Sequence, residues 1–172
     1  MTQNESNPYV GPRPFERKAE DSARFFGRSQ ETQEIVSLIF GHPAILVYAQ
    51  SGAGKTSLFN ASITSHLEEN GFDVLPLTRV GGAVPKDVAI KEIKNLYIFN
   101  ALLKLDSATD PRTLLSNSLL TYLETRVRTT DENSQSRPRV IIFDQFEELF
   151  TYTPENWREQ RERFFLQIAE AL

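Results

Sequence analysis

The sequence predicts an α/β protein in which two layers of helices enclose a mainly parallel sheet. Three short apolar runs, residues 44–48, 72–77 and 139–143, have the length and composition of strands that are buried on both faces. Segments with helical spacing of apolar residues separate these runs, and such alternation is typical of parallel sheets. The chain of 172 residues is long enough for one domain with its own core.

The first part of the chain predicts an arm followed by a helix. Residues 1–16 begin with a polar stretch and contain three prolines, which favour an extended or turn-rich conformation. We therefore divide the chain into an arm at 1–16 and one domain at 17–172. Within that domain a helix is expected over 29–40, with Ser29 as its N-cap.

The later helices are predicted by their apolar spacing and their boundary residues. We expect helices over 54–69, 95–105 and 112–127, and a polar surface loop over 129–137. A last helix is expected to start at Thr153-Pro154, because proline is favoured at the first helical position. One side of that helix carries Trp157, Phe164, Phe165, Ile168 and Leu172.

Composition excludes several classes of function. The net charge of −4 argues against nucleic acid as the main partner, since binding phosphates along a strand needs a basic surface. The chain has no cysteine, so disulfides and cysteine-based metal sites are excluded. Its first residues lack the basic start and apolar run that predict a signal peptide, and no apolar run in the sequence has the length expected of a membrane span. We therefore expect a cytoplasmic protein without a membrane partner.

A phosphate-binding loop is predicted in the stretch 44–63, AILVYAQSGAGKTSLFNASI. It fits the Walker A pattern G-x-x-x-x-G-K-[ST], except that Ala49 stands where the first glycine is usual, and a small residue is expected to serve there. Glycines let backbone N–H groups face the phosphates at the positive end of a helix. Lys55 is expected to reach the β- and γ-phosphates, and the Thr56 hydroxyl to bind Mg²⁺. The predicted nucleotide-binding residues of the loop are Ser51, Gly52, Ala53, Gly54, Lys55, Thr56 and Ser57.

A second signal is the acidic end of the run 139–143, which has the form of a Walker B motif. Asp144 follows the apolar run directly, so its carboxylate is expected at the carboxyl end of a strand, where it can hold Mg²⁺. Gln145 stands where many ATPases keep their catalytic glutamate. We therefore expect Glu147 or Glu148, with Lys55, to be catalytic, and the choice between the two glutamates stays open. Together the two motifs predict the three-layer P-loop NTPase fold.

Four motifs are spaced along the chain. They are Tyr9-x-Gly11-x-Arg13-Pro14-Phe15, Phe25-Phe26-Gly27-Arg28, the phosphate loop, and Asp144-Gln145-Phe146-Glu147-Glu148-Leu149-Phe150. Together they resemble the STAND NTPases, and more narrowly the bacterial novel STAND type that often precedes sensor repeats in conflict systems. The last motif also resembles the D-G-h-D-E segment of NACHT domains. The resemblance covers most of the chain.

The resemblance implies an ATP-driven switch in signalling or defence. In such proteins ADP holds a closed monomer, and ATP with a trigger gives an open oligomer, so the implied cofactors are ATP or ADP with Mg²⁺. The resemblance also implies that Phe26, Gly27 and Arg28 lie near the adenine. No guanine-reading N-K-x-D motif is present, which favours ATP over GTP.

The same resemblance implies that the domain is incomplete at its C-terminal side. In this class a further strand lies between the acidic strand and the phosphate-loop strand and carries a polar sensor residue. After Thr151 the sequence predicts only one helix. We therefore expect the N-terminal portion of an NTPase domain, completed by C-terminal domains or by a protein partner. Alternatively, the acidic strand lies directly beside the phosphate-loop strand, as in GTPases and kinases.

Three functions remain to be distinguished. The first is a switch that hydrolyses ATP slowly, because the cationic groups that speed phosphoryl transfer are not evident in the sequence. The second is a non-catalytic nucleotide-binding module for oligomerisation or interaction. The third is a small-molecule kinase with 129–137 in a lid, but only Arg128 and Arg137 flank that loop.

Overall fold

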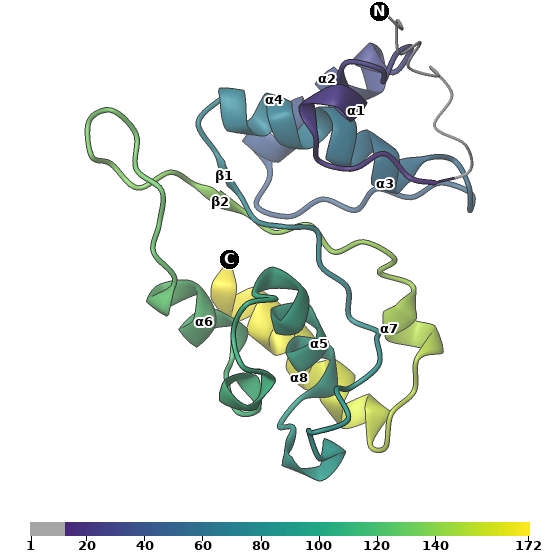
Figure 1. The fold of residues 1–172 in the computed structure, drawn as a ribbon, viewed down its shortest axis with the longest axis vertical. Helices are drawn as coiled ribbons and strands as arrows, with labels where there is room; N and C mark the ends of the chain where they lie inside the picture. The colour runs from purple at the N-terminus through teal and green to yellow at the C-terminus, as the bar shows by residue number, and fades with distance from the viewer. Residues whose placement is uncertain (1–12) are drawn as a thin grey trace, which may run out of the picture. The chain divides into compact units, whose positions relative to one another are not determined.

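The computed structural model describes residues 13–172 and divides the chain after Phe72 into two compact units, each of which is considered by itself (Figure 1). Tyr9 and Gly11 of the N-terminal motif lie outside the described residues. The predicted boundary between an arm and a domain at residue 16 remains a prediction.

The first unit is helical. It consists of α1 (Ala19–Ser22), α2 (Ser29–Gly41) and a continuous helical run after the phosphate loop. That run comprises α3 (Lys55–Leu58), a π-helical segment η1 (Phe59–Ile63) and α4 (Thr64–Glu69), which agrees with the helix expected over 54–69. Both α1 and α2 pack against η1. Segments of π-helix are rare and are often found at functional sites.

The start of α2 corrects one detail of the sequence analysis. Ser29 was expected to be the N-cap, but the helix begins at Ser29 and its N-cap is Arg28. No side chain accepts a hydrogen bond at this cap. The hydroxyl of Thr32 instead donates to the carbonyl of Arg28 at 2.9 Å. A side chain of the helix itself therefore links the first turn to the N-cap residue.

The predicted buried strand over 44–48 is not formed. Residues 44–50 have no regular secondary structure, and none of them belongs to a strand or a β-bridge. Leu46 and Tyr48 are 74% and 87% exposed. A run of apolar residues becomes a strand only where a neighbouring strand satisfies its backbone groups. The described part of the chain supplies no such neighbour to this segment.

The second unit contains a short parallel sheet. Strands β1 (Asp73–Val74) and β2 (Arg139–Val140) pair in parallel, with Asp73 opposite Arg139 and Val74 opposite Val140. A single bridge between Thr78 and Phe143 continues the pairing. Two of the three expected strands therefore form, shorter than predicted, and their parallel direction agrees with the prediction. With two strands among the described residues, the structure supports an α/β fold but does not display three layers.

Helices make up most of the second unit, and two of them differ from prediction. The helix expected over 112–127 is divided, because the Ser118 side chain accepts from the Thr121 N–H and starts a new helix. The last helix begins at Trp157, and Pro154 precedes it. The elements are η2 (Ile90–Glu92), α5 (Leu96–Leu105), η3 (Pro111–Leu114), α6 (Leu119–Thr125), α7 (Glu148–Thr151) and α8 (Trp157–Ala171).

Helix α5 forms the centre of this unit, and α8 packs against both α5 and α6. Phe164 on α8 is fully buried, as the apolar pattern predicts, whereas Phe165 and Leu172 are exposed. Two glutamines of α8 also satisfy the ends of its neighbours. The Gln160 Oε1 accepts from Leu96 N–H at 2.8 Å, and the Gln167 Oε1 accepts from Leu119 N–H at 2.8 Å. Side chains of α8 therefore close the starts of α5 and α6.

Candidate functional site

The predicted phosphate loop has the backbone of an anion-binding turn. Gly52 and Gly54 adopt left-handed φ angles of 80° and 78°, which residues with a Cβ rarely adopt. Helical structure begins at Lys55 immediately after the second of these glycines. The N–H groups at the start of the helical run 55–69 therefore lie at the loop, where they favour a phosphate. An added Cβ at Gly52 would meet no atom within 4 Å, so space beside the loop is open.

The missing first glycine does not distort the loop. Ala49 is absent from the residues with positive φ, so its conformation does not require glycine. Lys55 donates from Nζ to the carbonyls of Ala49 at 2.8 Å and Gln50 at 3.3 Å. Two of the three N–H donors of the ammonium group thus hold the start of the loop to its end. The cation stays within the loop as a result.

Arg28 also contacts the loop. Its Nη1 donates to the carbonyl of Ala53 at 2.6 Å, and its Nε pairs with Glu31 at 3.2 Å. The left-handed φ of 83° at Gly27 turns the chain just before this arginine. The backbone N–H of Glu31 itself, and then the Arg28 guanidinium, hold the pKa of the Glu31 carboxyl below its usual value. Phe26 is 81% exposed, and the adenine role implied for Phe26, Gly27 and Arg28 stays a prediction.

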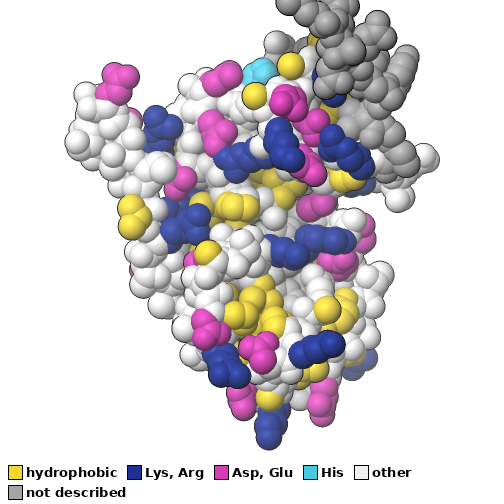
Figure 2. Space-filling model, in the orientation of Figure 1, with side chains coloured by type: hydrophobic (Ala, Val, Ile, Leu, Met, Phe, Trp, Pro, Cys, Tyr) yellow, Lys and Arg dark blue, Asp and Glu magenta, His cyan; other side chains and the backbone are white. Residues whose placement is uncertain are grey.

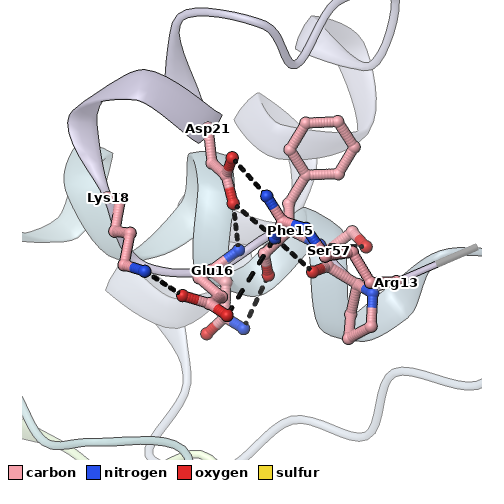
Figure 3. A network of polar contacts seen from close by, with 8 residues as sticks. Arg13, Phe15, Glu16, Lys18, Asp21 and Ser57 are labelled. Atoms are coloured by element: carbon pink, nitrogen blue, oxygen red, sulfur yellow. Dashed lines mark hydrogen bonds and ion pairs between the residues drawn. The ribbon is translucent and has the colours of Figure 1, made fainter. Parts of the chain in front are cut away.

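Residues 13–16 are docked onto the helical run that follows the loop (Figure 3). The Phe15 N–H donates to the Ser57 hydroxyl at 3.1 Å, and Asn60 Nδ2 donates to the Phe15 carbonyl at 3.0 Å. The Phe15 ring packs edge-on against Phe25, with the ring centroids 5.4 Å apart. Ser57 directly follows Thr56 and is predicted to bind nucleotide. In the structure its hydroxyl instead accepts from the Phe15 N–H and so holds residues 13–16.

Asp21 is the buried carboxylate that secures the docked segment (Figure 3). It accepts from the Glu16 N–H at 2.7 Å, and from the Arg13 guanidinium at 3.2 and 3.4 Å. The Glu16 N–H and then the Arg13 hydrogen bond hold the pKa of the Asp21 carboxyl below its ordinary value of 3.8. Sequence reasoning missed Asp21, because no motif marks a carboxylate that binds the backbone of an earlier segment.

Acid should release this docked segment. A carboxyl whose pKa is lowered by folding stabilises the protein above its ordinary pKa, and that contribution is lost as the pH falls through the lower folded value. We expect Asp21→Asn to lower the midpoint of thermal unfolding at pH 6, and the difference from wild type to shrink below about pH 4. Circular dichroism melts between pH 6 and pH 3 measure this. Glu20→Gln on the same helix is the control, and a difference that is independent of pH would contradict the role of Asp21.

The acidic strand end lies in the second unit. Asp144 follows the bridge residue Phe143, and its N–H donates to the Thr78 carbonyl at 2.8 Å. Gln145 then adopts a φ of 52°, which is uncommon without glycine and turns the chain towards α7. In the D-G-h-D-E segment that this stretch resembles, a glycine stands at the Gln145 position. The left-handed turn gives a physical reason for that glycine.

The two candidate glutamates have different surroundings. Glu147 is the N-cap residue of α7 and is exposed. Glu148 is half-buried, and its Oε1 accepts from Arg79 Nη2 at 2.7 Å while its Oε2 accepts from the Gly81 N–H at 3.1 Å. Arg79 and Gly81 were not expected at the site, because their contact with Glu148 joins segments far apart in the sequence.

The structure thus gathers the predicted residues into two groups. The loop residues and Arg28 lie in the first unit, and Asp144, Glu147 and Glu148 lie in the second. A shared Mg²⁺ site formed by Thr56 and Asp144 stays a prediction, although a hydroxyl and a carboxylate are oxygen donors that suit this ion. Within residues 13–172 no three acidic or histidine side chains cluster as metal ligands.

On the face shown in Figure 2, basic and acidic side chains are interspersed and no large area of one sign is visible. None of the described helices has the length and apolarity needed to cross a membrane.

A family model with the description Novel STAND NTPase 1 matches residues 8–172. No curated protein and no solved structure matches the chain.

Proposed function

Because the chain belongs to the Novel STAND NTPase 1 family, we propose that it binds ATP with Mg²⁺ and hydrolyses it slowly, as the nucleotide-controlled switch of a signalling or defence protein. The phosphate loop is the observation that carries this proposal. It combines two left-handed glycines, the start of a helix and a lysine held within the loop. These features are what a polyphosphate requires of a binding loop.

The chemistry follows from the residue types on the two units. The N–H groups of the loop and Lys55 would hold the phosphates, and Thr56 and Asp144 would hold Mg²⁺, which supplies positive charge to the phosphate oxygens. In hydrolysis the oxygen of a water molecule bonds to the γ-phosphorus, and the bond to the bridging oxygen breaks. ADP and phosphate leave, and a carboxylate accepts the proton of the water.

Replacement of Lys55 by Ala tests the binding half of the proposal. Charge-assisted hydrogen bonds contribute about 1.5–3 kcal/mol, so we expect the Kd for Mg-ATP to rise about 10- to 100-fold. Titration of the whole chain with a fluorescent ATP analogue measures this change. Lys104→Ala, on the exposed side of α5, is the matched control and should bind as wild type does. Equal affinity in wild type and Lys55→Ala would remove the loop from the proposed site.

A further inference from the structure

Arg79 follows the bridge residue Thr78 and is held in place by its two neighbours in the sequence. The Thr78 hydroxyl donates to the Ala101 carbonyl at 2.7 Å, and Asn100 Nδ2 donates to the Val80 carbonyl at 3.0 Å. Thr78, Val80 and Asn100 are buried, so α5 fixes the backbone on both sides of Arg79. The guanidinium of Arg79 therefore projects from a rigid position, one residue after the bridge between Thr78 and Phe143, the residue that precedes Asp144.

The Glu148 carboxylate contacts both Arg79 and Gly81. One of its oxygens pairs with Arg79 and the other accepts from the Gly81 N–H. An added Cβ at Gly81 would lie 2.7 Å from Glu148 Oε2 and 2.9 Å from its Cδ, which is closer than real Cβ contacts come. The Glu148 carboxylate therefore occupies space that is open because Gly81 has no side chain. Both oxygens of this carboxylate are engaged as hydrogen-bond acceptors.

Glu147 has no such restraint. Its side chain is exposed and makes no hydrogen bond or ion pair with other residues of the range 13–172. The two adjacent carboxylates therefore differ in whether polar contacts restrain their side chains. To accept a proton, Glu148 would have to give up its pairing with Arg79, whereas Glu147 would lose no contact.

We propose that Arg79 is a positioning residue of the hydrolytic site: it fixes Glu148 against Gly81, which anchors α7, and thereby presents Glu147 as the carboxylate that accepts the proton of the attacking water. This inference rests on the proposed ATP hydrolysis and decides between its two candidate bases. Loss of positioning affects the reaction more than the binding of substrate, because misplacement of a catalytic group raises the barrier. Arg79 acts on kcat through Glu148.

The experiment measures kcat and KM for Mg-ATP with the whole chain. We expect Arg79→Ala to lower kcat about 10- to 100-fold while KM changes little. Arg79→Lys retains a cation for Glu148 and should restore most of the rate. Gly81→Ala removes no polar group but pushes Glu148 aside, so it should lower kcat as Arg79→Ala does. Arg112→Ala, at an exposed arginine of the same unit, is the control and should leave both parameters unchanged.

A double variant tests whether Arg79 acts through Glu148. If it does, Arg79→Ala should cost little further rate in a Glu148→Gln background, since coupled residues are non-additive. An equal loss of rate in both backgrounds would overturn the proposal, as would unchanged kcat in Arg79→Ala and Gly81→Ala. If wild type still turns over ATP, either of these outcomes would overturn the positioning role of Arg79 and leave the proposed ATP hydrolysis standing. Absence of Mg-dependent turnover in wild type would instead overturn both.

Discussion

Replacement of Glu147 by Gln should lower the kcat for ATP hydrolysis about 10²- to 10⁴-fold, the usual contribution of a general base. Gln has nearly the same shape as Glu but accepts no proton at neutral pH. Because the Glu147 side chain is exposed and makes no polar contact within residues 13–172, its replacement should leave the fold and the Kd for ATP almost unchanged. Phosphate release at saturating Mg-ATP, with a parallel nucleotide titration, measures both quantities.

Glu148→Gln provides the comparison for this prediction. Its amide oxygen can still accept from the Gly81 N–H, but the ion pair with Arg79 is lost. We therefore expect a smaller loss of kcat than in Glu147→Gln, accompanied by a lower thermal midpoint. The reverse order of the two losses would make Glu148 the base. A wild-type chain that binds ATP but releases no phosphate would favour the non-catalytic binding module over the ATPase.

The parts of the fold that depend on local pattern could be predicted from the sequence. Helices α2 and α5 were expected within one residue of their observed bounds, because their apolar spacing and boundary residues are local. The family was also identified, since four motifs at fixed spacing are a property of the sequence itself, and the family model confirms it. The segment 44–48 has an equally strong local pattern, but a strand also depends on its neighbour, which no local pattern reports.

In the candidate site, too, the features that depend on local sequence could be predicted and the contacts between distant segments could not. The left-handed glycines of the phosphate loop and the position of Asp144 follow from short motifs. The hydrogen bond between Arg79 and Glu148 spans 69 positions, and the one between Phe15 and Ser57 spans 42. Contacts of this kind depend on how the elements pack together, so a single sequence does not reveal them. The contact between Arg79 and Glu148 is nevertheless what distinguishes Glu148 from Glu147.

A buried ion pair between the two strands carries the largest predicted effect on stability. Arg139 Nε donates to Asp73 Oδ2 at 2.9 Å, and the two side chains are only 8% and 13% exposed. The guanidinium also donates to the carbonyls of Leu123 at 2.8 Å and Val127 at 3.3 Å, where the chain leaves α6. One side chain thus joins β1, β2 and the end of α6.

Arg139→Ala should therefore lower the free energy of unfolding of the second unit by about 3–5 kcal/mol, because the Asp73 carboxylate would stay buried without its partner. Urea unfolding followed by the fluorescence of Trp157, the single tryptophan of the chain, reports on this unit. Arg163→Ala breaks an exposed pair with Glu159 on α8 and should cost only about 0–1 kcal/mol. Removal of both partners in Asp73→Ala/Arg139→Ala should cost less than the sum of the single changes, since no unpaired charge remains. Additive losses would mean that Arg139 stabilises the sheet through the Leu123 and Val127 carbonyls and independently of Asp73.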